Sequence, residues 1–195
     1  VNIMSGEYDD SMIAGFLIAL RAKGENSEEI AGFAQAMREK MTSIPISSDA
    51  IDMCGTGGDA SGTFNISTAA SFVVAGAGVK VAKHGNRSMT SRSGSADVLE
   101  ALGVDITLSA EKVAECIETI GLGFMFAPSL HPAMKYVMGV RKSLAIRTVF
   151  NILGPLCNPA GIKRQVIGVF DEKFTERMAE VLKLLGAKHA MIVHG

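Results

Sequence analysis

The stretch DMCGTGGDASGTFNIST, residues 52–68, decides the fold class, because it joins a short apolar strand to a helix through a glycine-rich loop. Ile51 to Cys54 form the predicted strand, and the predicted helix covers STAASFVVAGAG, which begins at Ser67. Bare backbone N–H groups in such a loop, next to the positive end of a helix dipole, favour a bound anion. The stretch therefore predicts an anion site at the carboxyl end of a strand, with a tight turn and no ligand as the alternative.

Strand and helix patterns alternate along the rest of the chain. Helical patterns cover SADVLEALG, the segment after Ser109, the segment from Pro128 to Leu153, and the segment from Asp171 to Leu185. Short apolar runs that predict strands begin at Val79, Val104, Gly123, Gln165 and His189. This alternation predicts an α/β fold with a mostly parallel sheet flanked by helices. The helix from Ser67 is apolar almost all round, which predicts burial against that sheet.

The first 46 residues follow a different, wholly helical pattern. One helix is predicted to begin at Asp10 and to stop at Gly24, and Ser27 is predicted to cap a second helix. Pro45 and the two serines that follow it mark a domain boundary. We therefore expect a small helical domain at residues 1–46 and an α/β domain at residues 47–195.

Composition and charge narrow the function classes. The net charge is −1 at pH 7, with cationic and anionic residues interspersed, so no global field favours DNA or an anionic membrane. Apolar runs are too short to span a bilayer, and Cys54, Cys116 and Cys157 form no CxxC pair. We expect a cytoplasmic protein with free thiols that binds neither nucleic acid nor membrane.

A second polar loop, KHGNRSMTSRSGSAD at residues 83–97, follows the next predicted strand. It concentrates cationic side chains and hydroxyl groups in an otherwise neutral chain, and Gly85 and Gly94 permit tight geometry. Because carboxyl ends of parallel strands meet at one edge of a sheet, both loops are expected there, around a ligand with more than one phosphate and a sugar. The alternative is a solvated surface loop in which Ser95 and Asp97 only cap a helix.

Known phosphate and catalytic motifs do not account for these loops. The P-loop pattern fails because no Gly-Lys follows the glycines, and no nucleophile elbow or Ser-His-Asp order is present. Gly55, Gly57 and Ala60 meet the dinucleotide pattern, but the helix starts too late, at about Asn65 to Ser67. Arg141 and Arg147 lie in the segment after Pro128, where each is a solvated or salt-bridged surface residue unless one of them clamps a carboxylate.

Four segments closely resemble the bacterial anthranilate phosphoribosyltransferases of tryptophan biosynthesis. They are GTGGD…TFNIST, AKHGNR…SRSGSADVLEALG, GFMFAPSLHPAMK and RTVFNILGPLCNPA, and the similarity runs in register along the whole chain. The resemblance implies transfer of the phosphoribosyl group of phosphoribosyl pyrophosphate (PRPP) to the amine of anthranilate, which gives N-(5-phosphoribosyl)anthranilate and pyrophosphate. It also implies a homodimer through the helical domain, which the helices at about 128–153 join in space.

The resemblance assigns site residues by position. The implied PRPP ligands are Gly55, Gly58, Asp59, Thr63, Asn65, Ile66, Ser67, Thr68, Lys83, His84, Gly85, Asn86, Arg87, Ser88, Met89, Thr90, Ser91 and Ser95. Anthranilate would contact Gly55 and Asn86, with Arg141 gripping its carboxylate. Ser67 would be a ligand of Mg²⁺, the implied cofactor. No catalytic residue is assigned, and His84 is kept only as a candidate.

The chain departs from the family pattern at both ends. The family begins with a further helix or so, and it has an Asp-Glu pair that holds Mg²⁺ a few residues beyond the equivalent of Gly195. The chain is therefore expected to be a fragment, incomplete at the C-terminal end of its α/β domain and inactive alone. Two alternatives stay open: a pyrimidine nucleoside phosphorylase-like enzyme, and a non-catalytic PRPP-binding fragment.

Overall fold

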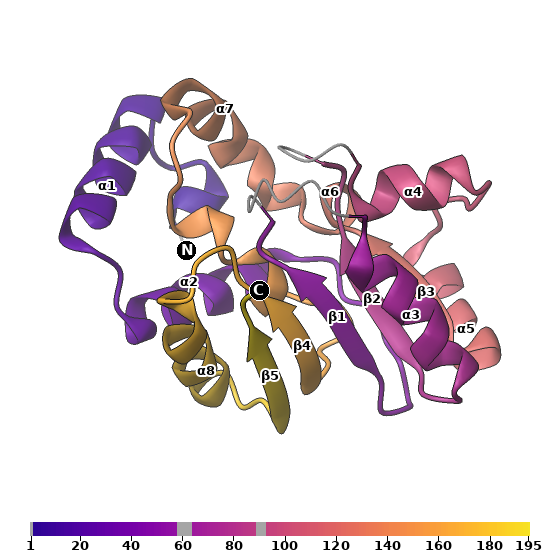
Figure 1. Cartoon of the computed structure of the whole chain (residues 1–195). Helices are drawn as coiled ribbons and strands as arrows, with labels where there is room; N and C mark the ends of the chain where they lie inside the picture. Colours follow the sequence, from indigo (N-terminus) through magenta and orange to yellow (C-terminus); the bar gives the residue numbers. More distant parts are fainter. Residues whose placement is uncertain (1, 58–63, 89–92) are drawn as a thin grey trace.

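Five parallel strands form one sheet in the computed structural model, which describes residues 2–57, 64–88 and 93–195 (Figure 1). The strands are β1 Ile51–Gly55, β2 Val81–Gly85, β3 Leu122–Phe126, β4 Arg164–Gly168 and β5 His189–Val193. Their order is β3-β2-β1-β4-β5, so β1 lies at the centre. The predicted α/β class with a parallel sheet is confirmed. The predicted strand at Val104 is wrong, because that segment forms a turn in which Ile106 packs against α4.

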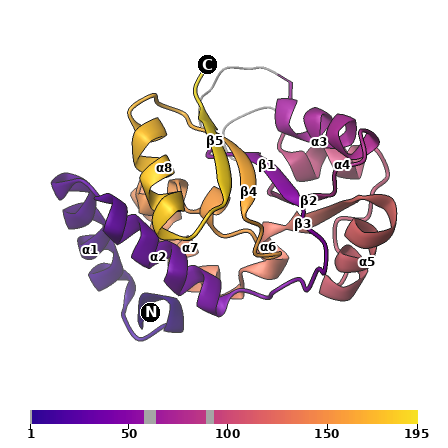
Figure 2. The ribbon, with the colours of Figure 1, turned by 90° about the horizontal axis from the view of Figure 1, so that it is seen from below.

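Helices cover both faces of the β1–β3 half of the sheet (Figure 2). Side chains of β3 point alternately to the two faces, as in any strand. Phe124 and Phe126 pack towards α4 Ser95–Ala101, whereas Met125 packs towards α5 Ala110–Ile120. The helix α3 Ile66–Gly76 contacts β1 and β2 on the α4 side. The two predicted loops therefore lead into helices on the same face.

The helix α3 packs against β1 and β2, as expected, but few of its side chains are buried. Its buried residues are Thr68 and Ser71, whereas Val73 is 72% exposed. The hydroxyl of Thr68 bonds that of Ser95, and the hydroxyl of Ser71 bonds the carbonyl of Ser67. The side chains of α3 that face the sheet are thus hydrogen-bonded hydroxyl groups, and much of the apolar surface of this helix faces outward.

Two helices precede the sheet, as predicted: α1 Asp10–Lys23 and α2 Ser27–Lys40, after the 3-10 turn η1 Asn2–Ser5. Gly24 ends α1 with φ 85°, a conformation that favours glycine. The cap of α2 is Asn26 rather than the predicted Ser27. Asn26 Oδ1 accepts from the Glu29 N–H at 2.8 Å, while Glu29 accepts from the Asn26 N–H at 3.0 Å.

The segment from Pro128 to Leu153 is helical but broken. It contains α6 Ala127–Leu130, η2 Pro132–Met134, α7 Lys135–Leu144 and η3 Val149–Asn151, and η4 Gly154–Leu156 follows. Pro132 lacks the N–H needed to continue α6. Ala145 has φ 51°, a left-handed conformation that ends α7. These breaks turn the chain from the sheet towards α1 and back.

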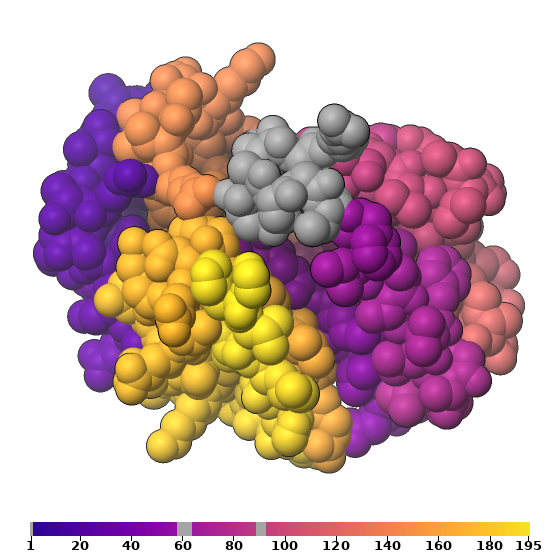
Figure 3. Space-filling view, viewed as in Figure 1, coloured from indigo at the N-terminus to yellow at the C-terminus, as the bar shows by residue number. Residues whose placement is uncertain are grey.

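One hydrophobic cluster runs from the N-terminal helices to the sheet. Residues of α1 and α2 share it with α7, with β4 and with α8 Phe174–Leu184. α1 packs against α7, and α2 packs against α8. The space-filling view shows indigo residues of the N-terminal helices directly beside the gold residues of α8 (Figure 3). Across the described ranges, no helix is long and apolar enough to cross a membrane.

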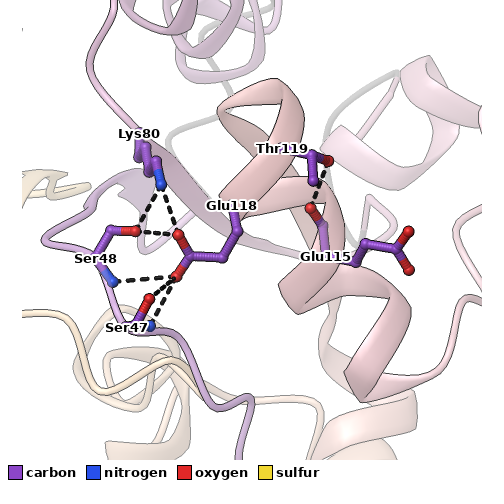
Figure 4. Close-up of polar contacts among 6 residues, drawn as sticks. All are labelled: Ser47, Ser48, Lys80, Glu115, Glu118 and Thr119. Atoms are coloured by element: carbon purple, nitrogen blue, oxygen red, sulfur yellow. Dashed lines mark hydrogen bonds and ion pairs between the residues drawn. The ribbon is translucent and has the colours of Figure 1, made fainter.

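The connection between α2 and β1 is tied to α5 by one carboxylate (Figure 4). Glu118 Oε1 accepts from the N–H groups of Ser47 and Ser48 at 2.7 and 3.1 Å, and Glu118 also accepts from both serine hydroxyls. Lys80 Nζ lies 2.5 Å from Glu118 Oε2 and 2.6 Å from Ser48 Oγ. We call Glu118, Lys80, Ser47 and Ser48 the linker latch.

Candidate functional site

The two predicted loops meet where their helices begin. β1 and β2 end at Gly55 and Gly85, at the carboxyl edge of the sheet. Thr68 Oγ1 lies 3.0 Å from Ser95 Oγ, a hydrogen bond that joins the start of α3 to the start of α4. Lys83 Nζ lies 3.3 Å from Ser67 Oγ. The structure thus brings a buried cation, two helix starts and several hydroxyls to one place.

Glycines allow the close approach of the backbone at this edge. Gly55 pairs with Gly168 of β4, and a Cβ on Gly55 would lie 3.3 Å from the Gly168 carbonyl oxygen. A Cβ on Gly85 would lie 2.7 Å from the Phe124 ring. β1 lies between β2 and β4, the position where the strand order reverses and where α/β sheets bind ligands. Gly55 therefore lies in the crevice that the topology creates.

The cap of the helix after the first loop is Asn65 rather than a hydroxyl residue. Asn65 Oδ1 accepts from the Thr68 N–H at 3.1 Å, from Thr68 Oγ1 at 2.8 Å and from Ser67 Oγ at 3.2 Å. Ile66 begins the helix and is exposed. Asn65 thus fixes Ser67 and Thr68 at the positive end of α3, where an anion is favoured.

Lys83 is the buried cation of the site. Its ammonium donates to the Met53 carbonyl at 2.7 Å. Burial lowers the pKa of Lys83, while the negative charge of Asp52 acts in the opposite direction. A buried ammonium beside a helix start is a suitable partner for a phosphate group.

The ring of His84 lies on the opposite face of β2, because successive residues of a strand alternate. His84 Nε2 lies 3.2 Å from His131 Nε2, and His84 is 6% exposed. Burial lowers the pKa of His84 to about 3 and that of His131 to about 4. Both rings are therefore neutral at pH 7. A ring with so low a pKa is a weak base, so this geometry disfavours a catalytic role for His84.

Asp97 closes the base of the second loop. Its Oδ2 accepts from the N–H groups of Ser88 and Gly94 at 2.9 and 2.7 Å. A Cβ on Gly94 would lie 2.4 Å from the nitrogen of Ser88, so only glycine fits there. The Asn86 carbonyl accepts from the Ala96 N–H at 3.2 Å. The cap by Asp97, which belongs to the alternative of a solvated surface loop, is present. Asp97 also draws the two ends of the loop together.

Arg87 pairs with two carboxylates of α4. Its guanidinium forms two hydrogen bonds with Glu100, at 2.7 and 2.9 Å, and one with Asp97 at 3.2 Å. These carboxylates raise the pKa of Arg87, first through Glu100 and then through Asp97. Contact between Arg87 and a ligand would require a change of this ion-pair arrangement.

Arg141, on α7, lies over the Phe150 ring at 5.8 Å from its centroid. Desolvation by burial lowers the pKa of Arg141. No carboxylate of the described residues forms an ion pair with it. A half-buried guanidinium without an anionic partner is suited to a carboxylate ligand.

The remaining predicted ligands lie outside the described residues. They are Gly58, Asp59 and Thr63 of the first loop, and Met89, Thr90 and Ser91 of the second.

The described residues do not by themselves form a magnesium site. No group of three or more His, Cys, Asp or Glu side chains that could hold a metal occurs among them. Ser67 Oγ has an ammonium at 3.3 Å, which repels a cation. Ser67 therefore fits Mg²⁺ only together with anionic oxygens from elsewhere, such as those of phosphates.

Asp52 and Asn158 are site-adjacent residues that sequence reasoning missed. Asp52 lies fully buried beneath the site, and Asn158 Nδ2 donates to Asp52 Oδ2 at 2.9 Å. An aspartate inside an apolar strand was a signal that could have been followed. Asn158 follows Cys157 in an irregular segment, and no local pattern marks it.

Comparisons with known proteins find matching families and relatives along the chain. The model described as "Glycosyl transferase family, a/b domain" matches residues 47–195, and "Glycosyl transferase family, helical bundle domain" matches residues 1–41. The anthranilate phosphoribosyltransferase of Clostridium kluyveri is 57% identical over 195 residues, which make up 100% of this chain and 58% of the relative. The chain thus spans less than two thirds of the length of such curated relatives.

Two solved structures show the same likeness. Anthranilate phosphoribosyltransferase from Thermus thermophilus has a TM-score of 0.96 at 50% identity, and the match covers 100% of this chain and 59% of that one. Anthranilate phosphoribosyltransferase from Saccharomyces cerevisiae in complex with PRPP and Mg has a TM-score of 0.88 at 34% identity. The match covers 95% of this chain and 53% of the yeast chain.

Proposed function

We propose that the protein carrying this chain transfers the phosphoribosyl group of PRPP to anthranilate, because the chain belongs to the glycosyl transferase family whose helical bundle and a/b domains it matches. The resemblance to anthranilate phosphoribosyltransferases is confirmed by relatives that match the chain end to end. The reaction forms a bond between the anthranilate nitrogen and the anomeric carbon while pyrophosphate leaves.

The observation that carries the proposal is the junction of the two loops. The buried ammonium of Lys83 lies beside Ser67 at the positive end of α3, and Thr68 links this helix start to Ser95 of α4. Such a cradle stabilises the negative charge that develops on a leaving pyrophosphate. The aromatic amine of anthranilate is already nucleophilic, so positioning and leaving-group charge account for most of the catalysis. This fits a site in which the one candidate base, His84, is buried and neutral.

We expect Mg²⁺ to act with the substrate. Ser67 Oγ is the described residue proposed as a ligand, alongside pyrophosphate oxygens and acidic residues expected beyond Gly195. When bound, the ion would supply further charge stabilisation at the leaving group.

We further propose the domain and assembly arrangement given by the resemblance. Residues 1–46 and the helices at about 128–153 would form the helical domain, and residues 47–195 would belong to the α/β domain. An apolar groove of about 460 Å³ between α1 and α2, lined in part by Phe16 and Phe33, supports a homodimer through this domain. The three unpaired cysteines are consistent with a cytoplasmic location.

Turnover is tested with the protein extended to the length of its relatives. Anthranilate fluorescence should fall when PRPP and Mg²⁺ are added, and N-(5-phosphoribosyl)anthranilate should appear in equal amount. No turnover, or phosphorolysis of uridine or thymidine in its place, would contradict the proposal.

Arg141→Ala should raise the KM for anthranilate by about tenfold to a hundredfold, since a charge-assisted hydrogen bond contributes about 1.5–3 kcal/mol. The KM for PRPP should stay at its wild-type value. Lys142→Ala, which removes an exposed cation from the neighbouring position on α7, is the matched control and should change neither constant. A loss of PRPP binding in Arg141→Ala would show that the carboxylate role is wrong.

A further inference from the structure

Side chains, rather than a full backbone ladder, join the carboxyl halves of β1 and β2. Within the described ranges these strands pair in register only at Ile51 and Val81, whereas β1 and β4 pair at every position from Ile51–Arg164 to Gly55–Gly168. In a fully paired parallel ladder, the backbone N–H groups of one strand donate hydrogen bonds to the carbonyl groups of its neighbour. Beyond Ile51, the facing groups of β1 and β2 therefore need other partners.

Two buried residues supply partners from one face of the sheet. Asp52 Oδ1 accepts from the His84 N–H at 3.2 Å, and Asn158 Nδ2 donates to the Ala82 carbonyl at 2.9 Å. The same Asn158 amide donates to Asp52 Oδ2 at 2.9 Å. Asp52 and Asn158 are 0% and 4% exposed. Both carboxylate oxygens are thus occupied, and the pair fixes the distance between the strands.

Lys83 bridges the same gap from the other face. Its ammonium donates to the Met53 carbonyl across the gap at 2.7 Å and lies 3.3 Å from Ser67 Oγ at the start of α3. The separation of β1 and β2 therefore sets where this ammonium lies in the cradle. Burial raises the pKa of Asp52, and the positive charge of Lys83 opposes that effect, so the two charges also attract each other through the sheet.

We propose that Asp52 and Asn158 are positioning residues for PRPP: they hold β1 and β2 apart so that the Lys83 ammonium lies between the strands and faces the start of α3. Neither residue lies in the cradle itself, and both act through Lys83 and the backbone of β2. The inference rests on the proposed function, because it takes PRPP as the ligand.

The test compares Asn158→Ala and Asp52→Asn with Gln165→Leu in the protein extended to the length of its relatives. Gln165 is the matched control, because it is a buried amide opposite Asp52 on β4 that donates to the Pro155 carbonyl at 2.8 Å. Each variant is measured for thermal midpoint, for PRPP affinity by calorimetry, and for KM of each substrate. If Asp52→Asn does not fold, Asn158→Ser provides a second, milder variant.

All variants should be less stable, since each loses a buried hydrogen bond. The Asp52 and Asn158 variants alone should raise the Kd and KM for PRPP, by about tenfold or more, with the KM for anthranilate unchanged. The positioning role would be overturned if the Kd and KM for PRPP were the same in the wild type and the Asn158 variants. It would also be overturned if Gln165→Leu raised these two constants as much as the Asp52 and Asn158 variants do. A wild type that binds PRPP without turnover would contradict the transfer reaction while leaving the affinity comparison decisive. A wild type that does not bind PRPP would overturn both.

Discussion

At the residue scale, His84 and His131 bring two titratable rings into direct contact away from water. Their Nε2 atoms are 3.2 Å apart, and both rings are buried. One ring must donate and the other accept, so the pair is stable only while at least one ring is neutral. Sequence patterns placed His84 in a polar loop, but strand alternation turns the His84 ring away from the loop.

The pair predicts a loss of stability in mild acid. The folded-state pKa values of about 3 and about 4 lie below the ordinary value of 6.5, so the unfolded state binds protons first as the pH falls. The stabilisation is complete above pH 6.5 and is lost as the pH falls from there towards 4. Each histidine contributes a slope of at most about 1.4 kcal/mol per pH unit in that window.

Denaturant unfolding from pH 7 to pH 4.5 measures this slope. His131→Gln should reduce the slope by about one histidine's share. An unchanged slope in His131→Gln would contradict the buried neutral pair.

At the element scale, the linker latch fixes where the α/β segment begins. Glu118 lies on α5, while Ser47 and Ser48 lie in the connection before β1, so the carboxylate joins segments about 70 residues apart. Hydrogen bonds from Lys80 and the two serines lower the pKa of Glu118. The Ile51 N–H donates to the Lys80 carbonyl at the start of β1, so the latch lies at the opposite edge of the sheet from the candidate site.

Glu118→Gln should destabilise the protein at pH 7, because the amide cannot accept from Lys80 with a full charge. A depressed carboxyl pKa contributes stability above the ordinary value of 4.5 and loses it as the pH falls. The difference in denaturation midpoint between the variant and the wild type should therefore shrink below pH 4.5.

Glu115→Gln is the control, since Glu115 lies one turn earlier on α5 (Figure 4). Its carboxylate pairs only with the exposed Lys112 among the described residues. The denaturation midpoint of Glu115→Gln should match that of the wild type at pH 7, where Glu118→Gln is destabilised. Equal effects of the two substitutions would show that the latch contributes nothing specific.

Sequence patterns predicted most elements because their signals are local. Gly24, Ser109 and the glycine loop after Cys54 each mark an end that the structure confirms. The predicted strand at Val104 failed because apolar alternation does not reveal that a segment has no neighbour to pair with. Asn158 could not be predicted either, since its partners Asp52 and Ala82 are 106 and 76 residues away.

At the scale of the whole molecule, the N-terminal helices leave an apolar face open. Phe16 is 45% exposed and lines the groove with Phe33, and Met12 and Ile18 on the same helix are also exposed. Apolar patches of this kind are typical of interfaces between subunits. Two residues that line the groove also belong to the core shared with α7 and α8: Leu20 is buried in it, and Phe33 packs against it.

Phe16→Asp should convert the proposed homodimer to a monomer, because a charge in the groove would be desolvated on association. Sedimentation equilibrium should give half the wild-type mass. Ile120→Asp, at the exposed end of α5 and 71% exposed in the wild type, should leave the mass unchanged. A wild type that sediments as a monomer would rule out the proposed assembly.

The shared core also has a consequence for synthesis on the ribosome. α1 ends at residue 23, but its partner α7 begins only at residue 135, and the partner of α2, α8, begins at residue 174. At translation rates of about 5–20 residues per second, the first helices wait on the order of ten seconds for the surfaces that cover them. The nascent helices α1 and α2 are thus exposed to chaperones and proteases until α7 and α8 have emerged, and they complete their packing well after they are made.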